Sequence, residues 1–247
     1  MASSRVTTGV MSNTHCAPSE LGDERMSGDP SSGDPPMDDV PGPGFDTGDA
    51  HAHMDPETVL ANTSVVVASN RRQNYTARSA PDWLEVIVRQ DDGRNRARNR
   101  GVERANGEWI VVADDDITFP TKLTSILVDG MKQHHLVGLE DFWPMRWLLT
   151  RYMVFHRSLW EGVDGFDEGR EHGGDTDFCM KCEKYGAKLC PLPRRTVPHH
   201  DVDTTFDTER HLEWLSYLFR RHPGKTAVPA AKLALARFGL VADYADR

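Results

Sequence analysis

One strand-like segment constrains the fold of this chain more than any other, because three consecutive acids follow it directly. The segment Glu108–Ala113 reads Glu-Trp-Ile-Val-Val-Ala, in which five of six residues are apolar or aromatic, and Gly107 precedes it as a turn residue. An apolar run of this length beside a turn residue is typical of a buried strand. Asp114, Asp115 and Asp116 therefore stand at the carboxyl end of a predicted strand.

Three adjacent acids repel one another, so this triplet is typical of a site that binds a cation. A divalent ion that carries a diphosphate fits, because Mg²⁺ and Mn²⁺ prefer carboxylate and phosphate oxygen atoms as ligands. The alternative is a polar loop whose three acids face solvent. The triplet alone does not distinguish these two interpretations, so the residues around it are considered next.

Strand-like and helix-like segments alternate after the triplet and before it, which predicts an α/β fold with a mostly parallel, Rossmann-like sheet flanked by helices. The predicted strands are Thr63–Ser69, Pro81–Val88, Glu108–Ala113, Leu148–Phe155 and Lys188–Leu192. The predicted helices are 94–106, 119–133, Arg157–Glu161, Asp175–Tyr185, His211–His222 and Val228–Val241. In the helix at 211–222, Leu212, Leu215, Leu218 and Phe219 are expected on one face.

Acidic residues follow two of the predicted strands. Asp91 and Asp92 come after the strand that ends at Val88, and the triplet comes after Ala113. Ligands of such sheets bind beyond the carboxyl ends of the strands. We therefore expect both acidic groups to converge on one cleft.

Three further groups of residues accompany the triplet in a fixed order. Ala97-Arg98-Asn99-Arg100-Gly101 precedes it, and Gly162-Val-Asp-Gly-Phe-Asp-Glu168 and then Gly174-Asp175-Thr176-Asp177 follow it. In this order the groups closely resemble the inverting family 2 glycosyltransferases of GT-A fold, whose pattern runs ARNxG, a hydrophobic run ending in DDD, GGFDE, and GEDTD. The resemblance covers roughly residues 63 to 205, and the chain is similar to an unusually short member of that family.

The resemblance implies transfer of a sugar from a nucleoside-diphosphate sugar to an acceptor hydroxyl with inversion, assisted by Mn²⁺ or Mg²⁺. It implies that Asp116, with Asp114 assisting, binds the metal, which acts as a Lewis acid on the departing phosphate. A histidine after the last core strand often completes the metal shell in this fold, and His199 or His200 stands at that place. A pair of surface histidines is the alternative.

The general base is expected at the position of the family's Glu-Asp pair. Gly174-Asp175 stands there, so the glutamate is absent and Asp175 remains as the predicted base. Asp177 is the second candidate, although an N-terminal helix cap is the other role that its position allows.

The residues that hold the nucleotide are expected at several strand ends. The candidates are Ser69, Arg71, Asp92, Arg98, Asp114 and Asp115. Arg94, Arg96 and Arg100 also stand near Arg98, but helical spacing lets only one or two of these arginines face a cleft. The family usually has a strand–helix–strand stretch between its DDGS turn and ARNxG, whereas Gly93 and Ala97 are here four residues apart. Either that stretch is deleted, or an earlier unit is missing.

The acidity of the chain is concentrated in its first 60 residues, which hold eleven acids and two bases. This segment accounts for the whole net charge of −9 of the 247 residues. This Gly-, Pro- and Ser-rich segment is predicted to be disordered. The expected domains are thus the tail 1–60, a single GT-A-like domain 61–224 and an amphipathic C-terminal helix 225–247. The balanced charge of residues 61–247 argues against a nucleic-acid partner.

No signal peptide or transmembrane span is evident, so we expect a cytoplasmic protein, with peripheral contact of the last helix to the cytoplasmic face of a membrane as a second arrangement. The expected partners are the nucleotide-sugar donor and a glycan, lipid-linked or protein acceptor. An alternative function is a catalytically silent GT-A module that binds a sugar nucleotide or a protein partner. The short nucleoside region and Gly174 favour that alternative.

Overall fold

The computed structural model describes residues 55–141, 147–169, 173–200 and 208–237. These residues belong to one compact unit, which spans His53–Arg247. Of the predicted tail, only residues 55–60 fall within the described ranges. They include α1 (Pro56–Val59) and Leu60, whose side chain is buried in the core, so the folded part begins before residue 61.

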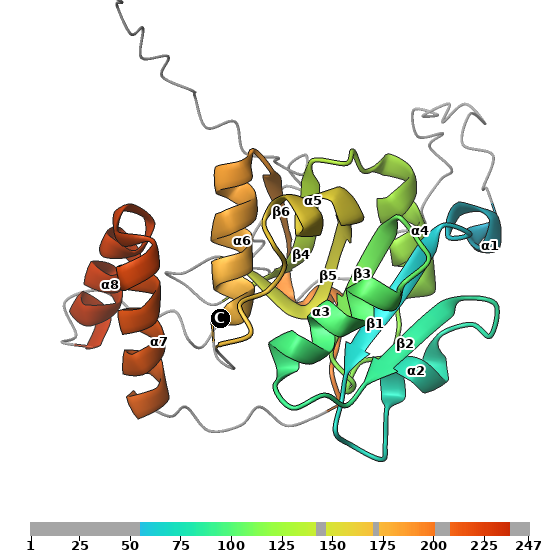
Figure 1. Ribbon diagram of the computed structural model, residues 1–247, viewed down its shortest axis with the longest axis horizontal. Helices are drawn as coiled ribbons and strands as arrows, with labels where there is room; N and C mark the ends of the chain where they lie inside the picture. Colours follow the sequence, from blue (N-terminus) through green and yellow to red (C-terminus); the bar gives the residue numbers. More distant parts are fainter. Residues whose placement is uncertain (1–54, 142–146, 170–172, 201–207, 238–247) are drawn as a thin grey trace, which may run out of the picture. The chain divides into compact units, whose positions relative to one another are not determined.

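A six-stranded sheet forms the centre of the unit (Figure 1). Its strands are β1 (Thr63–Ala68), β2 (Glu85–Arg89), β3 (Trp109–Ala113), β4 (His135–Glu140), β5 (Leu148–His156) and β6 (Lys188–Leu192). They lie in the order β2-β1-β3-β5-β4-β6. β1 is parallel to β2 and β3, and β4 is parallel to β6, whereas β5 is antiparallel to β3 and β4. Most pairings are thus parallel, which confirms the predicted α/β class.

The register of the sheet aligns the ends of three strands. Val67 of β1 pairs with Val88 of β2 and with Ala113 of β3. Because these strands are parallel, the chain leaves all three at the same edge of the sheet. The segments after Ala68, Arg89 and Ala113 therefore emerge at one edge, as the sequence predicted.

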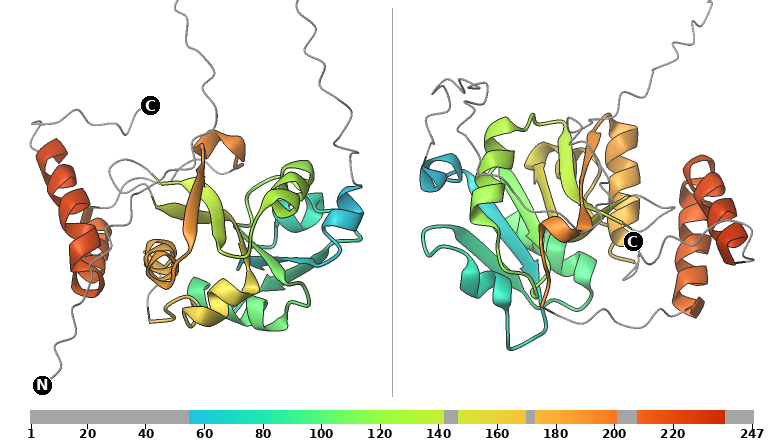
Figure 2. Two further views of the ribbon diagram at one scale, coloured as in Figure 1. Left: turned by 90° about the horizontal axis from the view of Figure 1, so that it is seen from above. Right: turned by 180° about the vertical axis from the view of Figure 1, so that it is seen from behind.

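Helices cover both faces of the sheet (Figure 2). The helices after α1 are α2 (Tyr75–Ser79), α3 (Arg94–Arg104), α4 (Thr121–Gly130), α5 (Arg157–Gly162) and α6 (Gly174–Tyr185), with a 3-10 turn η1 at Arg194–Thr196. Two more, α7 (Thr208–Arg221) and α8 (Pro223–Arg237), lie beyond α6 and do not cover the sheet (Figure 1). Successive side chains of a strand point to opposite faces. On β1, Val65 and Val67 pack in one core cluster with Val128 of α4, whereas Val66 packs in the other with Val102 of α3.

The position of α3 is fixed at two points. A Cβ atom at Gly101 would lie 2.2 Å from Cγ1 of Val66, so α3 approaches β1 more closely than a larger residue permits. At the other end, the guanidinium of Arg157 donates to the carbonyl oxygens of Val102 at 2.8 Å and Gly107 at 2.9 Å. These contacts hold the turn from α3 into β3, and therefore the strand that carries the acidic triplet.

The strand β4, which lies between β5 and β6, is absent from the sequence prediction. Its run His-Leu-Val-Gly-Leu-Glu is interrupted by Gly138, and the register of its pairing with β5 shifts between Gly138 and Leu139. A Cβ atom at Gly138 would lie 3.1 Å from Cβ of Leu148 and 3.2 Å from the carbonyl oxygen of Tyr152. The crowded bulge therefore favours a glycine, and the glycine weakens the strand pattern.

The start of β2 was also predicted four residues too early. The N–H of Leu84 donates to the carbonyl oxygen of Pro81 at 3.0 Å, which closes a turn, and the strand begins at Glu85. The short helices α1 and α2 were not predicted either. The side chain of Asn74 caps α2 by accepting a hydrogen bond from the N–H of Ala77 at 2.8 Å.

Two helices follow the sheet and contact each other. α7 packs against α6 through a cluster of Trp214, Tyr217 and Leu218 around Met180. Phe219, predicted on the apolar face, is instead about half exposed. α8 begins directly after α7 and continues through Pro229 to Arg237, so residues 238–241 of its predicted range lie outside the described residues. Within the described ranges, no helix has the length and apolarity that a bilayer span requires.

Candidate active site

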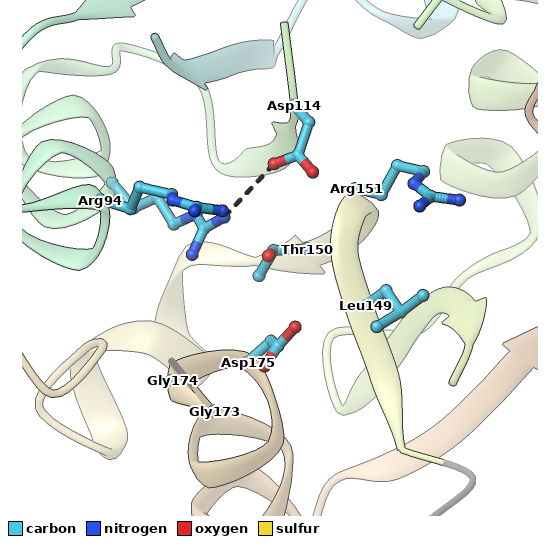
Figure 3. Close-up of a pocket in the computed structure, with 9 residues that line it drawn as sticks. Arg94, Asp114, Leu149, Thr150, Arg151, Gly173, Gly174 and Asp175 are labelled. Atoms are coloured by element: carbon cyan, nitrogen blue, oxygen red, sulfur yellow. Dashed lines mark hydrogen bonds and ion pairs between the residues drawn. The ribbon is translucent and has the colours of Figure 1, made fainter. Parts of the chain in front are cut away.

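A cavity of about 150 Å³ opens at the edge where the chain leaves β3 (Figure 3). It is lined by residues of α3, β3, β5 and α6, namely Arg94, Arg98, Asp114, Leu149, Thr150, Arg151, Gly173, Gly174 and Asp175. Asp114 and Asp175 lie on two sides of the cavity, and Thr150 lies between them (Figure 3). The fold therefore brings together two acids and an arginine that the sequence predicted for different roles.

The three acids of the triplet have different surroundings. Asp114 lines the cavity, and its carboxylate accepts a hydrogen bond from Nη2 of Arg98 at 3.3 Å. Asp115 is buried and accepts a hydrogen bond from the hydroxyl of Ser69. Asp116 is partly buried, and its main-chain oxygen accepts a hydrogen bond from the N–H of His200 at 2.7 Å. The triplet is therefore not a loop whose three acids all face solvent.

The two predicted histidines lie beside the triplet. Ile117 and His199 form an isolated antiparallel bridge, which holds residues 199–200 against residues 116–117. The ring of His200 stacks on that of Tyr75, with the ring centroids 4.3 Å apart, and its Nε2 lies 2.8 Å from Oγ1 of Thr118. His200 is thus engaged with α2 and with the segment after the triplet, and His199 stands next to it at the same edge.

Asp175 is the acid at the start of α6. The helix begins at Gly174, after Gly173 in a left-handed conformation with φ +77°, and the carboxylate of Asp175 accepts a hydrogen bond from the N–H of Thr176 at 2.9 Å. Burial raises the pKa of Asp175 above its ordinary value; Arg98 and that N–H oppose the rise, and Asp114 adds to it. A carboxylate with a raised pKa is a better proton acceptor.

Gly174 stands where the family pattern has a glutamate, and the packing explains the glycine. A Cβ atom at Gly174 would lie 2.0 Å from Nδ2 of Asn95. That Nδ2 donates to the main-chain oxygen of Asp167 at 2.8 Å, and Oδ1 of Asn95 accepts from Nη1 of Arg98 at 3.0 Å. The amide of Asn95 thus occupies the space beside residue 174 and orients a cavity arginine.

Asp177 does not line the cavity. Its side chain is fully buried on the side of α6 that faces the following helices, where Oδ1 accepts hydrogen bonds from Nε2 of His222 at 2.8 Å and Nε of Arg221 at 3.1 Å. The predicted helix cap is not observed either, because Gly173 occupies the N-cap position and provides no side-chain hydrogen bond. The geometry gives Asp177 a structural role.

The predicted nucleoside residues lie at the same edge but outside the cavity lining. Ser69 is buried, and its Oγ accepts a hydrogen bond from the N–H of Arg71 at 3.1 Å, while the Arg71 side chain is exposed. Asp92 is exposed in the turn after β2, whereas Asp91 forms a two-point ion pair with Arg89 at 2.7 Å. α3 begins directly after this turn, and within the described residues no strand pairs outside β2.

Helical spacing divides the arginines of α3, as predicted. Arg94 and Arg98 line the cavity. Arg96 instead bonds Glu168 at 3.2 Å, and Arg100 bonds Glu103 at 2.9 Å. Only one turn of the helix therefore presents its positive charges to the candidate site.

Thr150 and Arg151 belong to the cavity and were missed by the sequence prediction. They lie near the amino end of β5, which is antiparallel to β3 and so meets the carboxyl end of β3. The N–H of Asp114 donates to the carbonyl oxygen of Arg151 at 3.1 Å. A Thr-Arg pair inside an otherwise apolar strand is the signal that points to them.

No group of three or more His, Cys, Asp or Glu side chains arranged to hold a metal ion occurs among the residues that the structure describes. Mg²⁺ commonly binds through one or two carboxylates plus the phosphates of its substrate. The oxygen donors of the triplet, with an adjacent imidazole, fit such a shared site better than an all-protein metal cage.

Comparison with known proteins gives one family. Residues 60–159 match the family model described as glycosyl transferase family 2. No curated protein sequence matches the chain.

Several solved structures are similar at low identity. The mannosyltransferase PcManGT from Pyrobaculum calidifontis, in complex with GDP-Man and Mn²⁺, is 16% identical with a TM-score of 0.44, over 72% of this chain and 75% of that one. S. aureus TarS 1–349 in complex with UDP is 17% identical with a TM-score of 0.44, over 62% and 63% of the two chains. The catalytic domain of Drosophila β1,4-galactosyltransferase 7 with xylobiose is 14% identical with a TM-score of 0.42, over 61% and 77%.

These structural similarities are too distant to assign a substrate. The family match covers the strands β1–β5 with α3, α4 and the acidic triplet, and so includes every lining residue of the cavity except Gly173, Gly174 and Asp175. The chain therefore carries a glycosyltransferase domain of family 2, the class of enzymes that transfer a sugar from a nucleotide sugar.

Proposed function

We propose that the protein transfers a sugar from a nucleoside-diphosphate sugar to an acceptor hydroxyl with inversion, assisted by a divalent metal. The observation that carries the proposal is that Asp175, whose pKa is raised, lines one cavity together with Asp114 and Arg98. Inversion requires the base and the leaving group on opposite sides of the sugar. The positions of Asp114 and Asp175 on two sides of the cavity support this proposal (Figure 3).

Asp175 accepts the proton of the acceptor hydroxyl as that oxygen attacks the sugar. Burial at the first turn of α6 makes its carboxylate more basic than an exposed aspartate. General-base catalysis of this kind contributes about 10²–10⁴-fold to the rate. Asn95 and Gly174 leave the carboxylate of Asp175 as the acid that faces the cavity from α6.

The leaving diphosphate requires positive charge on the opposite side. Arg94 and Arg98 supply two guanidinium groups, which suit phosphate oxygen atoms geometrically. Asp116 and Asp114, with His199, would hold Mn²⁺ or Mg²⁺, which supplies Lewis-acid stabilisation of the departing phosphate when bound. His200, which contacts Tyr75 and Thr118 beside His199, is the other candidate for the imidazole ligand.

The nucleoside lies along the edge beyond β1 and β2 in this proposal. Arg71 and Asp92 are exposed there, and the hydroxyl of Ser69 donates to Asp115. Because α3 follows β2 directly, the nucleoside has fewer protein contacts than a longer domain would provide. The acceptor class and the cytoplasmic location stay predictions.

The test is release of nucleoside diphosphate from a panel of nucleotide sugars, with and without acceptor, in Mn²⁺ and then after metal removal by EDTA. We expect release with one donor of the panel, its loss in EDTA and its return with added Mn²⁺. Asp116→Ala should remove the metal dependence of donor binding, and Asp129→Ala, on the far end of α4, should not.

Two outcomes would contradict the proposal. Donor binding that is identical with and without metal would show that no metal takes part in holding the donor. Tight, saturable binding of a nucleotide sugar without turnover on any acceptor class would instead identify the silent sugar-nucleotide module.

A further inference from the structure

The first turn of α6 carries the proposed base, and a helix end of this kind needs external support. Helix termini fray more readily than helix interiors, and a shift of about 1 Å in a reacting group can reduce a rate by about 10²-fold. Gly173 and Gly174 begin the helix, and neither residue has a side chain that could anchor it. The support must come from neighbouring elements.

The last turn of α7 provides such support from behind the cavity. Arg221 donates from Nε to Asp177 at 3.1 Å, and His222 bonds the same carboxylate oxygen at 2.8 Å. Trp214 also packs on the start of the helix, since a Cβ atom at Gly173 would lie 1.9 Å from Cδ1 of its ring. α7 thus holds the turn that presents Asp175.

The same arginine reaches the segment that precedes α6. Nη1 of Arg221 donates to Oδ2 of Asp167 at 2.9 Å, and the hydroxyl of Tyr217 donates to the same oxygen at 2.7 Å. The main-chain oxygen of Asp167 in turn accepts from Asn95, which bonds Arg98 at 3.0 Å. This second chain of contacts ends at Arg98, which lines the cavity from α3.

We propose that Arg221 is a positioning residue, which sets the distance between the base on α6 and the phosphate-binding arginine on α3 by bridging Asp177 and Asp167. The inference rests on the proposed function of Asp175 and Arg98. Arg221 touches neither the cavity lining nor the reacting atoms. It acts on catalysis only through the two carboxylates that it joins.

The test compares Arg221→Gln with Arg220→Gln. Arg220 is the adjacent arginine on α7, is exposed, and bonds Ser216 of its own helix. At a temperature where all variants are folded, we expect Arg221→Gln to lower kcat by about 10–100-fold with the donor KM changed less than about threefold. Arg221→Lys should recover only part of kcat, because an ammonium lacks the planar fork that reaches both carboxylates.

Amide hydrogen exchange separates this inference from the proposed function, because it needs no activity. Exchange at Thr176, Asp177 and Phe178 should become faster in Arg221→Gln and stay unchanged in Arg220→Gln. That result supports the bridge even if no donor is turned over. If Arg221→Gln does not fold, Tyr217→Phe removes one bond to Asp167 and should lower kcat by a few-fold with KM unchanged.

Unchanged exchange and unchanged kcat in Arg221→Gln would overturn the inference. A fall in kcat that is matched by an equal rise in donor KM would also overturn it, because uniform loss of binding is not a positioning effect.

Discussion

Two aspartates stand two residues apart in the first turn of α6, and their surroundings differ completely. Asp175 faces the cavity, is partly buried and has a raised pKa. Asp177 faces α7, is fully buried, and accepts hydrogen bonds from Arg221 and His222. One helical turn therefore places one acid at the cavity and a second acid in buried contacts with Arg221 and His222.

The comparison shows why residue type alone could not assign these roles. The carboxylate of Asp177 is fully buried and held by a guanidinium and an imidazole, so it does not reach the cavity where an acceptor hydroxyl would lie. A carboxylate that burial makes more basic, beside an open cavity, has the properties that a general base needs. The first four predictions below test this division, in order of expected effect.

The largest expected effect is on turnover, when Asp175 at the cavity is replaced. Asp175→Asn keeps the shape of the side chain but removes its ability to accept a proton, so turnover should fall by about 10²–10⁴-fold. Single-turnover kinetics with saturating donor would measure this loss. Full activity of the variant would show that another group deprotonates the acceptor.

The second prediction concerns Asp177, the acid that contacts Arg221 and His222. Asp177→Asn leaves Arg221 and His222 without this buried carboxylate. Arg221 is 44% exposed and keeps Asp167 as a partner, so we expect a loss of about 1–3 kcal/mol from the charge-assisted hydrogen bonds. Urea unfolding should show this loss as a lower midpoint at an unchanged slope. A variant as stable as the wild type would mean that the contacts of α7 with Asp177 contribute little.

A third prediction extends the same division to α3. Arg94→Gln should weaken nucleotide-sugar binding by about tenfold, because one charge-assisted contact to phosphate is removed. Arg100→Gln is the matched control, because Arg100 pairs with Glu103 at the surface. Equal effects of the two substitutions would indicate general electrostatic attraction and not a contact in the cavity.

The smallest expected effect is a gain in stability. Because burial raises the pKa of Asp175 in the folded protein, its ionised form lowers stability at neutral pH, and Asp175→Asn should raise Tm there. The gain should disappear as pH falls below the ordinary pKa of an aspartate, where the wild-type carboxyl is protonated in both states. A destabilised variant at neutral pH would indicate that the ionised carboxylate is stabilised by its neighbours.

The sequence predicted the parts of the fold and site that depend on local patterns. β3 and the triplet follow from one apolar run and three acids, and the segments around Asn99 and Phe166 follow from their resemblance to a family pattern. The structure adds the physical reason for that second pattern. Nδ2 and Oδ1 of Asn99 bond the carbonyl oxygen and N–H of Phe166 at 2.8 and 2.9 Å, so the ARN and GFDE segments depend on each other.

The parts that were missed depend on residues distant in sequence. β4 is interrupted by a glycine that a bulge opposite Leu148 requires, and Thr150 and Arg151 reach the cavity only because β5 is antiparallel to β3. The role of Asp177 depends on Arg221 and His222, more than forty residues later. No periodicity in the sequence encodes such a contact, so the role of Asp177 required the tertiary structure.

The most direct test of the division between the two acids is donor affinity in the Asp175→Asn variant. Calorimetric titration of wild type and variant with the same nucleotide sugar, in the same Mn²⁺ buffer, should give dissociation constants that agree within about twofold, because Asp114, Asp116 and the α3 arginines hold the donor. A variant that binds the donor tenfold or more weakly would place Asp175 in the donor site and contradict its role as the base.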